Sequence, residues 1–176
     1  MHWFTRSWQL GDDPTEDPVS AYKTYLDSVA SELPDAVLAF AESRERHLAV
    51  DDAKVDQAIL DREARRVSLR LLNGDLPTGY GKLRLDFEDA DLVTPAPAEA
   101  EVLLRDAKTE FLVHEVELRA DGRLEVRFLL WPTGELVIRC HRLTTAWTPI
   151  KDQTRTAYRR DVVGFGPQPS SDIRAR

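Results

Sequence analysis

Phe111-Leu-Val-His-Glu-Val-Glu-Leu-Arg-Ala-Asp-Gly-Arg-Leu-Glu-Val-Arg-Phe-Leu-Leu-Trp-Pro-Thr-Gly-Glu-Leu-Val-Ile-Arg-Cys-His-Arg-Leu143 is the stretch that decides the fold of this chain. Two turn signals, Asp121-Gly122 and Pro132-Thr133-Gly134, divide it into three runs in which apolar and polar residues alternate. Such alternation is typical of strands that bury one face. The stretch is therefore predicted to form a three-stranded antiparallel meander over 111–143.

The first turn fixes which side chains lie opposite one another. A two-residue loop would set Leu118 opposite Glu125, which either buries a charge or exposes a leucine. A three-residue loop over 120–122 avoids this conflict, and Gly122 can take the left-handed conformation that its third position requires. The predicted pairs are Leu118 with Leu124, Val116 with Val126, His114 with Phe128 and Leu112 with Leu130.

The second turn admits the same solution. A three-residue loop over 132–134 again places a glycine, Gly134, at the third position. Apolar residues then face apolar residues across the second and third strands. The predicted pairs are Leu130 with Leu136, Phe128 with Ile138 and Val126 with Cys140.

In this register, the face of the meander that points away from the core is charged at one end and apolar at the other. Large apolar side chains are not normally left in water in such a group, so another segment of the chain is expected to cover the apolar end. The charged rows are Glu115, Arg127 and Arg139, then Glu117, Glu125 and His141; the apolar row is Val113, Leu129 and Val137, flanked by Phe111 and Trp131.

The segments before the meander predict helices followed by strands. Asp17 before Pro18 is a good N-cap with proline at the first helical position, and apolar residues at helical spacing follow it to Leu33. The aromatic residues of 1–9 are expected to dock on the body of the fold. A second short helix is predicted over 36–42, strands over 54–61, 67–71, 83–87, 91–94 and 144–150, and either helix or strand over 99–105.

This order of elements predicts an α+β fold, with N-terminal helices packed on a mainly antiparallel sheet of five to seven strands. One domain is expected over 1–150, followed by a basic and partly loose tail over 151–176. The tail holds six Lys or Arg against three Asp, so Arg155, Arg159 and Arg160 could contact an acidic partner. A solvated tail is the simpler interpretation.

Composition excludes several classes of protein. Hydrophobic residues make up 42% and charged residues 31%, as in ordinary globular proteins. A net charge of −7 argues against a nucleic-acid surface, and no apolar run is long enough to span a membrane. The start of the chain lacks the pattern of a secretion signal, and Cys140 is the one cysteine, so a cytoplasmic location is expected.

The opening Met1-His-Trp-Phe-Thr-Arg-Ser-Trp8 resembles the start of a bacterial family of uncharacterised proteins, a domain of unknown function. Phe111-Leu-Val-His-Glu115 and Glu135-Leu-Val-Ile138 are similar to two of its later stretches. Asp51-Asp52-Ala53 matches a His-Asp-Ala triplet of that family, with an aspartate in place of the histidine, so no role of that histidine is carried over. The resemblance implies bacterial origin and supports the architecture, and it implies no activity.

The chain contains none of the common catalytic or phosphate-binding motifs, and no metal or cofactor is expected. His47, Asp51, Asp52 and Asp56 could form a metal site by composition, but a solvated acidic loop is the simpler interpretation. His114 and Cys140 are expected to be inert core residues. The sharpest candidate for a binding site is the outer face of the meander, with Glu115, Glu117, Glu125, Arg127, Trp131, Arg139 and His141.

The preferred hypothesis is a non-catalytic protein-binding module whose acidic surface neutralises a basic partner, as an immunity protein neutralises a toxin. One alternative is a ligand-binding or hydrolytic domain that uses the face formed by Glu115, Glu117, Glu125 and His141. Another is a structural protein that associates with itself through a sheet edge or through Trp131. The same charged face could also be a solvated ladder of cross-strand ion pairs without a function.

Overall fold

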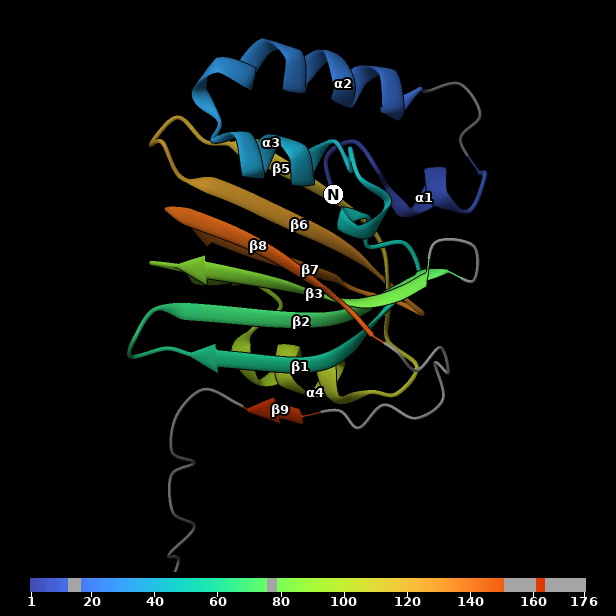
Figure 1. Ribbon diagram of the computed structural model, residues 1–176, viewed down its shortest axis with the longest axis vertical. Helices are drawn as coiled ribbons and strands as arrows, with labels where there is room; N and C mark the ends of the chain where they lie inside the picture. Colours follow the sequence, from blue (N-terminus) through green and yellow to red (C-terminus); the bar gives the residue numbers. More distant parts are fainter. Residues whose placement is uncertain (13–16, 76–78, 151–160, 164–176) are drawn as a thin grey trace, which may run out of the picture.

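Nine strands form a single sheet in the computed structural model, which describes residues 1–12, 17–75, 79–150 and 161–163 (Figure 1). The strand order is β4-β7-β6-β5-β1-β2-β3-β8, and β9 lies beside β1. The strands are β1 (Ala53–Asp61), β2 (Arg66–Asp75), β3 (Gly79–Glu88), β4 (Asp91–Thr94), β5 (Glu110–Leu118), β6 (Leu124–Trp131), β7 (Glu135–Cys140), β8 (Arg142–Pro149) and β9 (Asp161–Val163). The helices are α1 (Arg6–Gln9), α2 (Pro18–Val29), α3 (Asp35–Ala41) and α4 (Pro97–Arg105), with 3-10 turns η1 (Ala30–Glu32) and η2 (Arg46–Leu48).

The predicted α+β class is confirmed, but the predicted number of five to seven strands is too low. The four-residue β4 lies at the predicted 91–94, whereas the three-residue β9 lies in the predicted tail and was not expected. Alternation cannot identify strands of that length, because one or two apolar residues do not establish a period. All pairs are antiparallel except β1 with β9, which is parallel.

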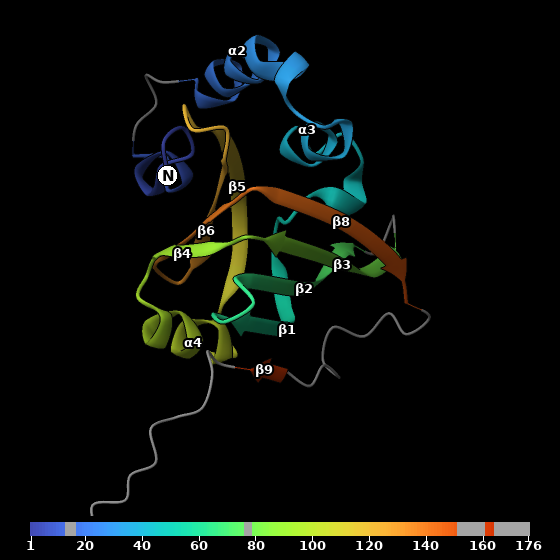
Figure 2. The same cartoon turned by 90° about the vertical axis from the view of Figure 1, so that its left-hand side faces the viewer.

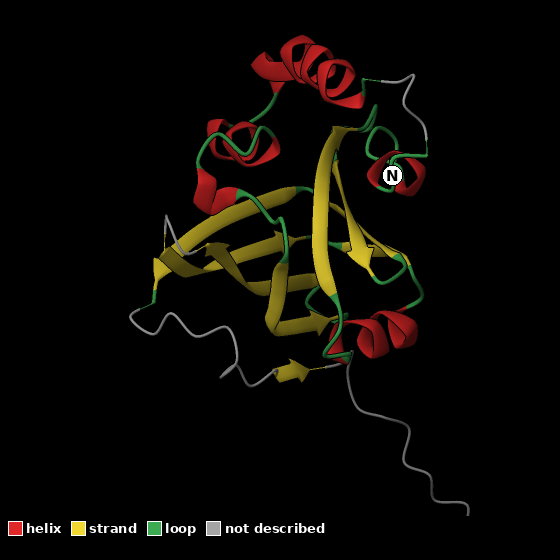
Figure 3. Cartoon of the chain, turned by 90° about the vertical axis from the view of Figure 1, so that its right-hand side faces the viewer, coloured by secondary structure: helices red, strands yellow, loops and turns green. Residues whose placement is uncertain are grey.

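The sheet consists of two halves that face each other across the core: β4, β7, β6 and β5 form one half, and β1, β2, β3 and β8 form the other. Strands β5 and β1 join the halves through only two residue pairs, Ala53 with Phe111 and Lys54 with Glu110. Figure 3 shows that the strands of the two halves cross at a steep angle. Phe128 of β6 packs edge-on against Phe87 of β3 and Phe111 of β5, with ring centroids 6.5 and 5.1 Å apart. All three rings are fully buried, so the core lies between the halves.

Helices cover the two ends of this core. Figure 2 shows α2, α3 and the N-terminal segment at one end and α4 at the other. Helix α2 begins as predicted, because the Asp17 side chain accepts a hydrogen bond from the backbone N–H of Ser20 at 3.1 Å. Tyr22 and Leu26 are its buried residues, together with Pro18. The segment 99–105, which the sequence left open between helix and strand, lies in α4.

The predicted first turn of the meander is confirmed. The backbone N–H of Arg119 bonds to the carbonyl of Arg123 at 2.8 Å, which closes a three-residue loop over 120–122, and Gly122 has φ +78°. Leu118 pairs with Leu124 and His114 with Phe128, as predicted. The predicted pair of Leu112 with Leu130 is wrong, because a bulge near the start of β5 brings Phe111 opposite Leu130 and turns the Phe111 ring into the core.

The predicted register of the second turn is wrong by two residues. The backbone N–H of Leu130 donates a hydrogen bond to the carbonyl of Gly134 at 3.1 Å, so the three-residue loop is 131–133. Phe128 therefore pairs with Leu136. A shift of two residues keeps every side chain on its face, so the hydrophobic pattern could not exclude it. In the observed register Gly134 lies close to Leu103 of α4, since a Cβ added to Gly134 would be 3.4 Å from the Leu103 side chain. Gly134 also has φ +100°, a conformation that favours glycine.

The end of the described chain returns to the sheet twice. Strand β8, predicted as an edge strand over 144–150, pairs with β3 along its whole length. Strand β9 pairs with 57–59 of β1, while the remainder of the predicted tail, 151–160 and 164–176, lies outside the described residues, as do Arg155, Arg159 and Arg160. Among the helices within the described ranges, none is long and apolar enough to cross a membrane.

Candidate functional site

The charged face predicted on the meander exists, although its rows differ from the prediction. Because β7 is shifted by two residues, Glu115 and Arg127 line up with Val137, and Glu117 and Glu125 line up with Arg139. Five of the seven predicted site residues therefore meet in one network of ion pairs, which we call the sheet-face network: Glu115, Glu117, Glu125, Arg127 and Arg139.

Glu115 is fully buried, and its carboxylate holds the start of the chain. It accepts hydrogen bonds from three successive backbone N–H groups, those of His2, Trp3 at 2.9 Å and Phe4 at 3.3 Å. The guanidinium of Arg127 lies 3.4 Å away and compensates the buried charge. Both oxygens of this carboxylate are thus used within the chain.

Glu125 lies between two arginines and is also buried. Its carboxylate accepts hydrogen bonds from Arg127, at 3.0 Å to Nε, and from Arg139, at 2.6 and 3.1 Å. Burial alone would raise the pKa of Glu125, but the hydrogen bonds from Arg139 and Arg127 outweigh it and lower the pKa. The hydrogen bond to Glu125 in turn raises the pKa of Arg139.

The N-terminal segment also contacts the apolar end of this face. The Arg6 guanidinium donates hydrogen bonds to the carbonyls of Leu130 at 2.6 Å, Pro132 at 3.2 Å and Gly134 at 3.3 Å. Leu129 and Val137 are buried. The expectation that this end is covered is confirmed for Leu129 and Val137 but not for Trp131, which stays 46% exposed. The aromatic N-terminus docks on the fold as expected.

Two predicted site residues lie outside the sheet-face network. His141 follows the end of β7, and its ring lies 3.3 Å from Asp89, so the predicted row of His141 with Glu117 and Glu125 is wrong. The cause is again the two-residue shift between β6 and β7. Trp131 lies at the end of β6 with 46% of its surface exposed, while the other three tryptophans are partly buried against the core.

A groove that sequence reasoning missed lies at the helical end of the molecule. It has a volume of about 500 Å³ and is walled by α2, the end of α3 with the residues after it, and β5. Its lining is mainly apolar at the floor, with charged side chains at the rim. The buried or part-buried apolar lining consists of Phe4, Tyr22, Leu26, Ala41, Val113 and His114, and the rim consists of Val19, Lys23, Glu42, Ser43, Arg44 and Asp51.

The charges at the rim are not equivalent. Lys23 forms an ion pair with Asp27 at 3.3 Å, one turn further along α2, and Arg44 forms one with Glu42. Within the described part of the chain, Asp51 forms no ion pair. Burial raises the pKa of Asp51, although Arg46 partly opposes this effect. Asp51 thus presents a carboxylate at the rim that forms no ion pair among the described residues, although the charge of Arg46 attracts it.

His114 lines the groove and is buried, as expected. Its Nε2 lies 2.9 Å from the carbonyl of Phe40, and the two rings stack with centroids 4.1 Å apart. Burial lowers the pKa of His114 to about 4, so the ring is neutral near pH 7. Burial also raises the pKa of Cys140 to about 12, which makes its thiol a poor nucleophile.

The residues considered for a metal site are dispersed. Asp56 is buried and paired with Arg70 and with Lys82 at 3.0 Å, while His47 lies 3.2 Å from Glu45 and beside Trp147. In the part of the chain that the structure describes, no group of three or more His, Cys, Asp or Glu side chains could hold a metal ion.

The sequence carried little signal for the groove. Its walls come from segments near residues 4, 19–26, 41–44, 51 and 113–114, which no local pattern relates to one another. The available signal was the apolar spacing of α2 together with the inward-facing His114. Comparison of the chain with models of protein families, with curated protein sequences and with solved structures found no match.

Proposed function

We propose that this protein is a non-catalytic binding module, and that its helical layer, defined as residues 17–52, binds a basic partner protein. The layer contains α2, α3 and both 3-10 turns, and it forms one end of the molecule (Figure 1). The proposal includes an immunity-like role, membership of the bacterial family that the N-terminus resembles, and a cytoplasmic location.

The distribution of charge is the observation that carries the proposal. Residues 17–52 contain eight acidic and three basic side chains, so this segment holds a net −5 of the −7 carried by the whole chain. Most of these acidic side chains are exposed, including those of Glu32, Asp35 and Glu45. A concentrated field of one sign steers a partner of opposite charge and raises its association rate.

The sheet-face network argues against catalysis on the outer face of the meander. A hydrolytic site there would need carboxylates that are free to transfer protons. Those of Glu115 and Glu125 instead accept hydrogen bonds from the chain's own backbone and arginines. The network therefore supports a role in holding the N-terminal segment to the sheet.

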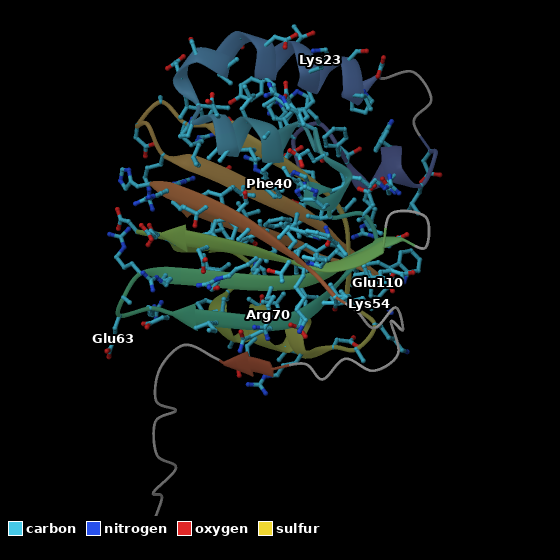
Figure 4. The ribbon with its side chains drawn as sticks, in the orientation of Figure 1. Lys23, Phe40, Lys54, Glu63, Arg70 and Glu110 are labelled. Carbon is cyan, nitrogen blue, oxygen red and sulfur yellow. The ribbon has the colours of Figure 1, made fainter. Side chains whose placement is uncertain are left out.

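The test is a quantitative affinity capture from cells of the source organism, with the full chain as bait. The E32Q/E45Q variant removes two exposed charges of the helical layer. The E63Q/E99Q variant is the matched control, because Glu63 and Glu99 are exposed in the turn before β2 and in α4. Figure 4 shows Glu63 at the opposite end of the molecule from Lys23 of α2.

We expect the wild type and E63Q/E99Q to retain the same basic protein in stoichiometric amount, and E32Q/E45Q to retain several-fold less. Capture by wild type should weaken as salt is raised, since exposed charges are screened over about 8–10 Å at physiological ionic strength. Equal capture by both variants, or a partner that is not basic, would contradict the proposal.

A further inference from the structure

The volume and lining of the groove limit the kind of group that could occupy it. Its volume of about 500 Å³ falls in the range of about 300–1,000 Å³ that is typical of ligand pockets. Leu26, Val113 and Phe4 give it apolar walls, so the part of an occupant that enters must be apolar. Val19, at the edge, is 56% exposed and offers further apolar contact to an occupant.

The rim determines the charge that should accompany this apolar group. Both cations at the rim, Lys23 and Arg44, already have carboxylate partners in Asp27 and Glu42. The Asp51 carboxylate is the rim charge without an ion pair among the described residues; Arg46 attracts it only partly, and the surrounding layer is acidic. A positively charged group at the rim would therefore gain attraction without displacing an existing pair.

We infer that the groove receives one or two apolar side chains of the partner protein, with an adjacent lysine or arginine paired to Asp51. This inference rests on the proposed function and names the part of the partner that the layer recognises. Buried apolar anchors surrounded by charged rims are the usual source of affinity at protein interfaces.

The experiment uses isotope-labelled full chain and three blocked hexapeptides as probes. The first, Gly-Lys-Leu-Phe-Lys-Gly, carries both features of the inferred anchor. In the second, Gly-Glu-Leu-Phe-Glu-Gly, the charge is reversed, and in the third, Gly-Lys-Ser-Ser-Lys-Gly, the apolar pair is removed. Two-dimensional NMR titration follows the amide signals of the groove and of the rest of the chain.

Two pairs of variants separate the groove from the rest of the surface. V113F adds bulk inside the groove, and V93F is its control on the edge strand β4, where Val93 is 48% exposed. D51N removes the rim charge, and E63Q removes one charge far from the groove. Far-UV circular dichroism and melting temperature establish that each variant is folded before it is titrated.

We expect the first peptide to shift signals of groove residues in a saturable manner and the other two to bind at least about tenfold more weakly. V113F should weaken binding of the first peptide by about tenfold, and D51N should weaken it by roughly three- to fivefold. V93F and E63Q should leave its affinity unchanged. Shifts outside the groove, or equal binding of the charge-reversed peptide, would overturn the inference.

The outcome is distinguishable from that of the proposed function. If the partner is captured through Glu32 and Glu45 but V113F retains it fully, the helical layer binds the partner and the groove inference is wrong. If the first peptide binds the groove while no basic partner is captured, the groove recognises amphipathic cations and the proposed partner is wrong.

Discussion

Glu115 joins two segments of the chain that are more than one hundred residues apart. Its buried carboxylate gathers the backbone N–H groups of His2, Trp3 and Phe4 at the start of the chain, and Arg127 balances its charge. Hydrogen bonds to a charged group contribute about 1.5–3 kcal/mol each, and an uncompensated partner is costly when buried. Glu115 therefore positions the N-terminal segment that covers the sheet face.

Replacing this carboxylate by an amide should destabilise the folded protein. We expect E115Q to lower the free energy of unfolding by about 2–4 kcal/mol in urea denaturation, because the neutral amide weakens the backbone hydrogen bonds and leaves Arg127 less compensated. E110Q is the matched control on the same strand, where Glu110 forms a part-exposed ion pair with Lys54 at 2.9 Å (Figure 4). It should cost less than about 1 kcal/mol. Equal losses would contradict the role assigned to Glu115.

His114 should make stability depend on pH. Its folded pKa is about 4 against an ordinary 6.5, so below 6.5 the unfolded state binds a proton that the folded state does not. Its contribution is therefore complete above about pH 6.5 and is lost as pH falls toward 4, by about 3 kcal/mol in total.

The comparison with H114Q isolates this contribution, since glutamine does not titrate and can still bond to the carbonyl of Phe40. We expect the stability advantage of wild type over H114Q to shrink by about 3 kcal/mol between pH 7 and pH 4. The imidazole signals in NMR should titrate near pH 4. A constant difference, or titration near pH 6.5, would show that His114 is not buried as described.

At the scale of single elements, the β3–β8 pair depends on a glycine. A Cβ on Gly81 would lie 2.2 Å from the ring of Trp147, which crosses directly over it and donates a hydrogen bond to Asn73 at 3.2 Å. The ring also lies 5.0 Å from that of His47, so Trp147 links β8 to β2 and η2. Gly81 is thus required by close packing.

We expect G81A to displace the Trp147 ring and to destabilise the protein by about 1–3 kcal/mol, with a change in tryptophan fluorescence. G122A is the control, because Gly122 has φ +78° but nothing lies within 4 Å of its Cβ position. It should cost about 1–2 kcal/mol through backbone strain alone and leave the fluorescence unchanged. An unaltered spectrum in G81A would contradict the packing described.

The two turns of the meander show how far an element can be predicted from its own residues. A two-residue loop at the first turn would place the apolar Leu118 opposite the charged Glu125, so the hydrophobic pattern excluded that register. The same pattern did not distinguish Phe128 opposite Ile138 from Phe128 opposite Leu136, since both keep the ring inside. Leu103 of α4, outside the meander, packs at Gly134 in the observed register.

At the scale of the whole molecule, Phe128 connects the two halves of the sheet. Its ring contacts Phe87 in one half and Phe111 in the other, whereas the strand ladder between β1 and β5, which joins the halves among the described residues, has two residue pairs. The halves should therefore unfold together, because their cohesion comes mainly from the shared core.

We expect F128A to destabilise the protein by about 3–5 kcal/mol and to lower hydrogen-exchange protection in β2 and β3 as well as in β5 and β6. F128L keeps most of the volume, so it should cost less than about 1.5 kcal/mol. Loss of protection confined to β5 and β6 would show that the halves unfold independently.

The sequence by itself determined the α+β class, the start of α2 at Asp17 and Pro18, the inward side of His114 and the association of Glu115 with Arg127. These features follow from local geometry, because the periods of helix and strand relate neighbouring residues directly. Only the tertiary structure decided the register of β7, the covering of Glu115 by residues 2–4 and the groove at Asp51. Each of these depends on contacts between segments far apart in the chain, where the local period carries no information.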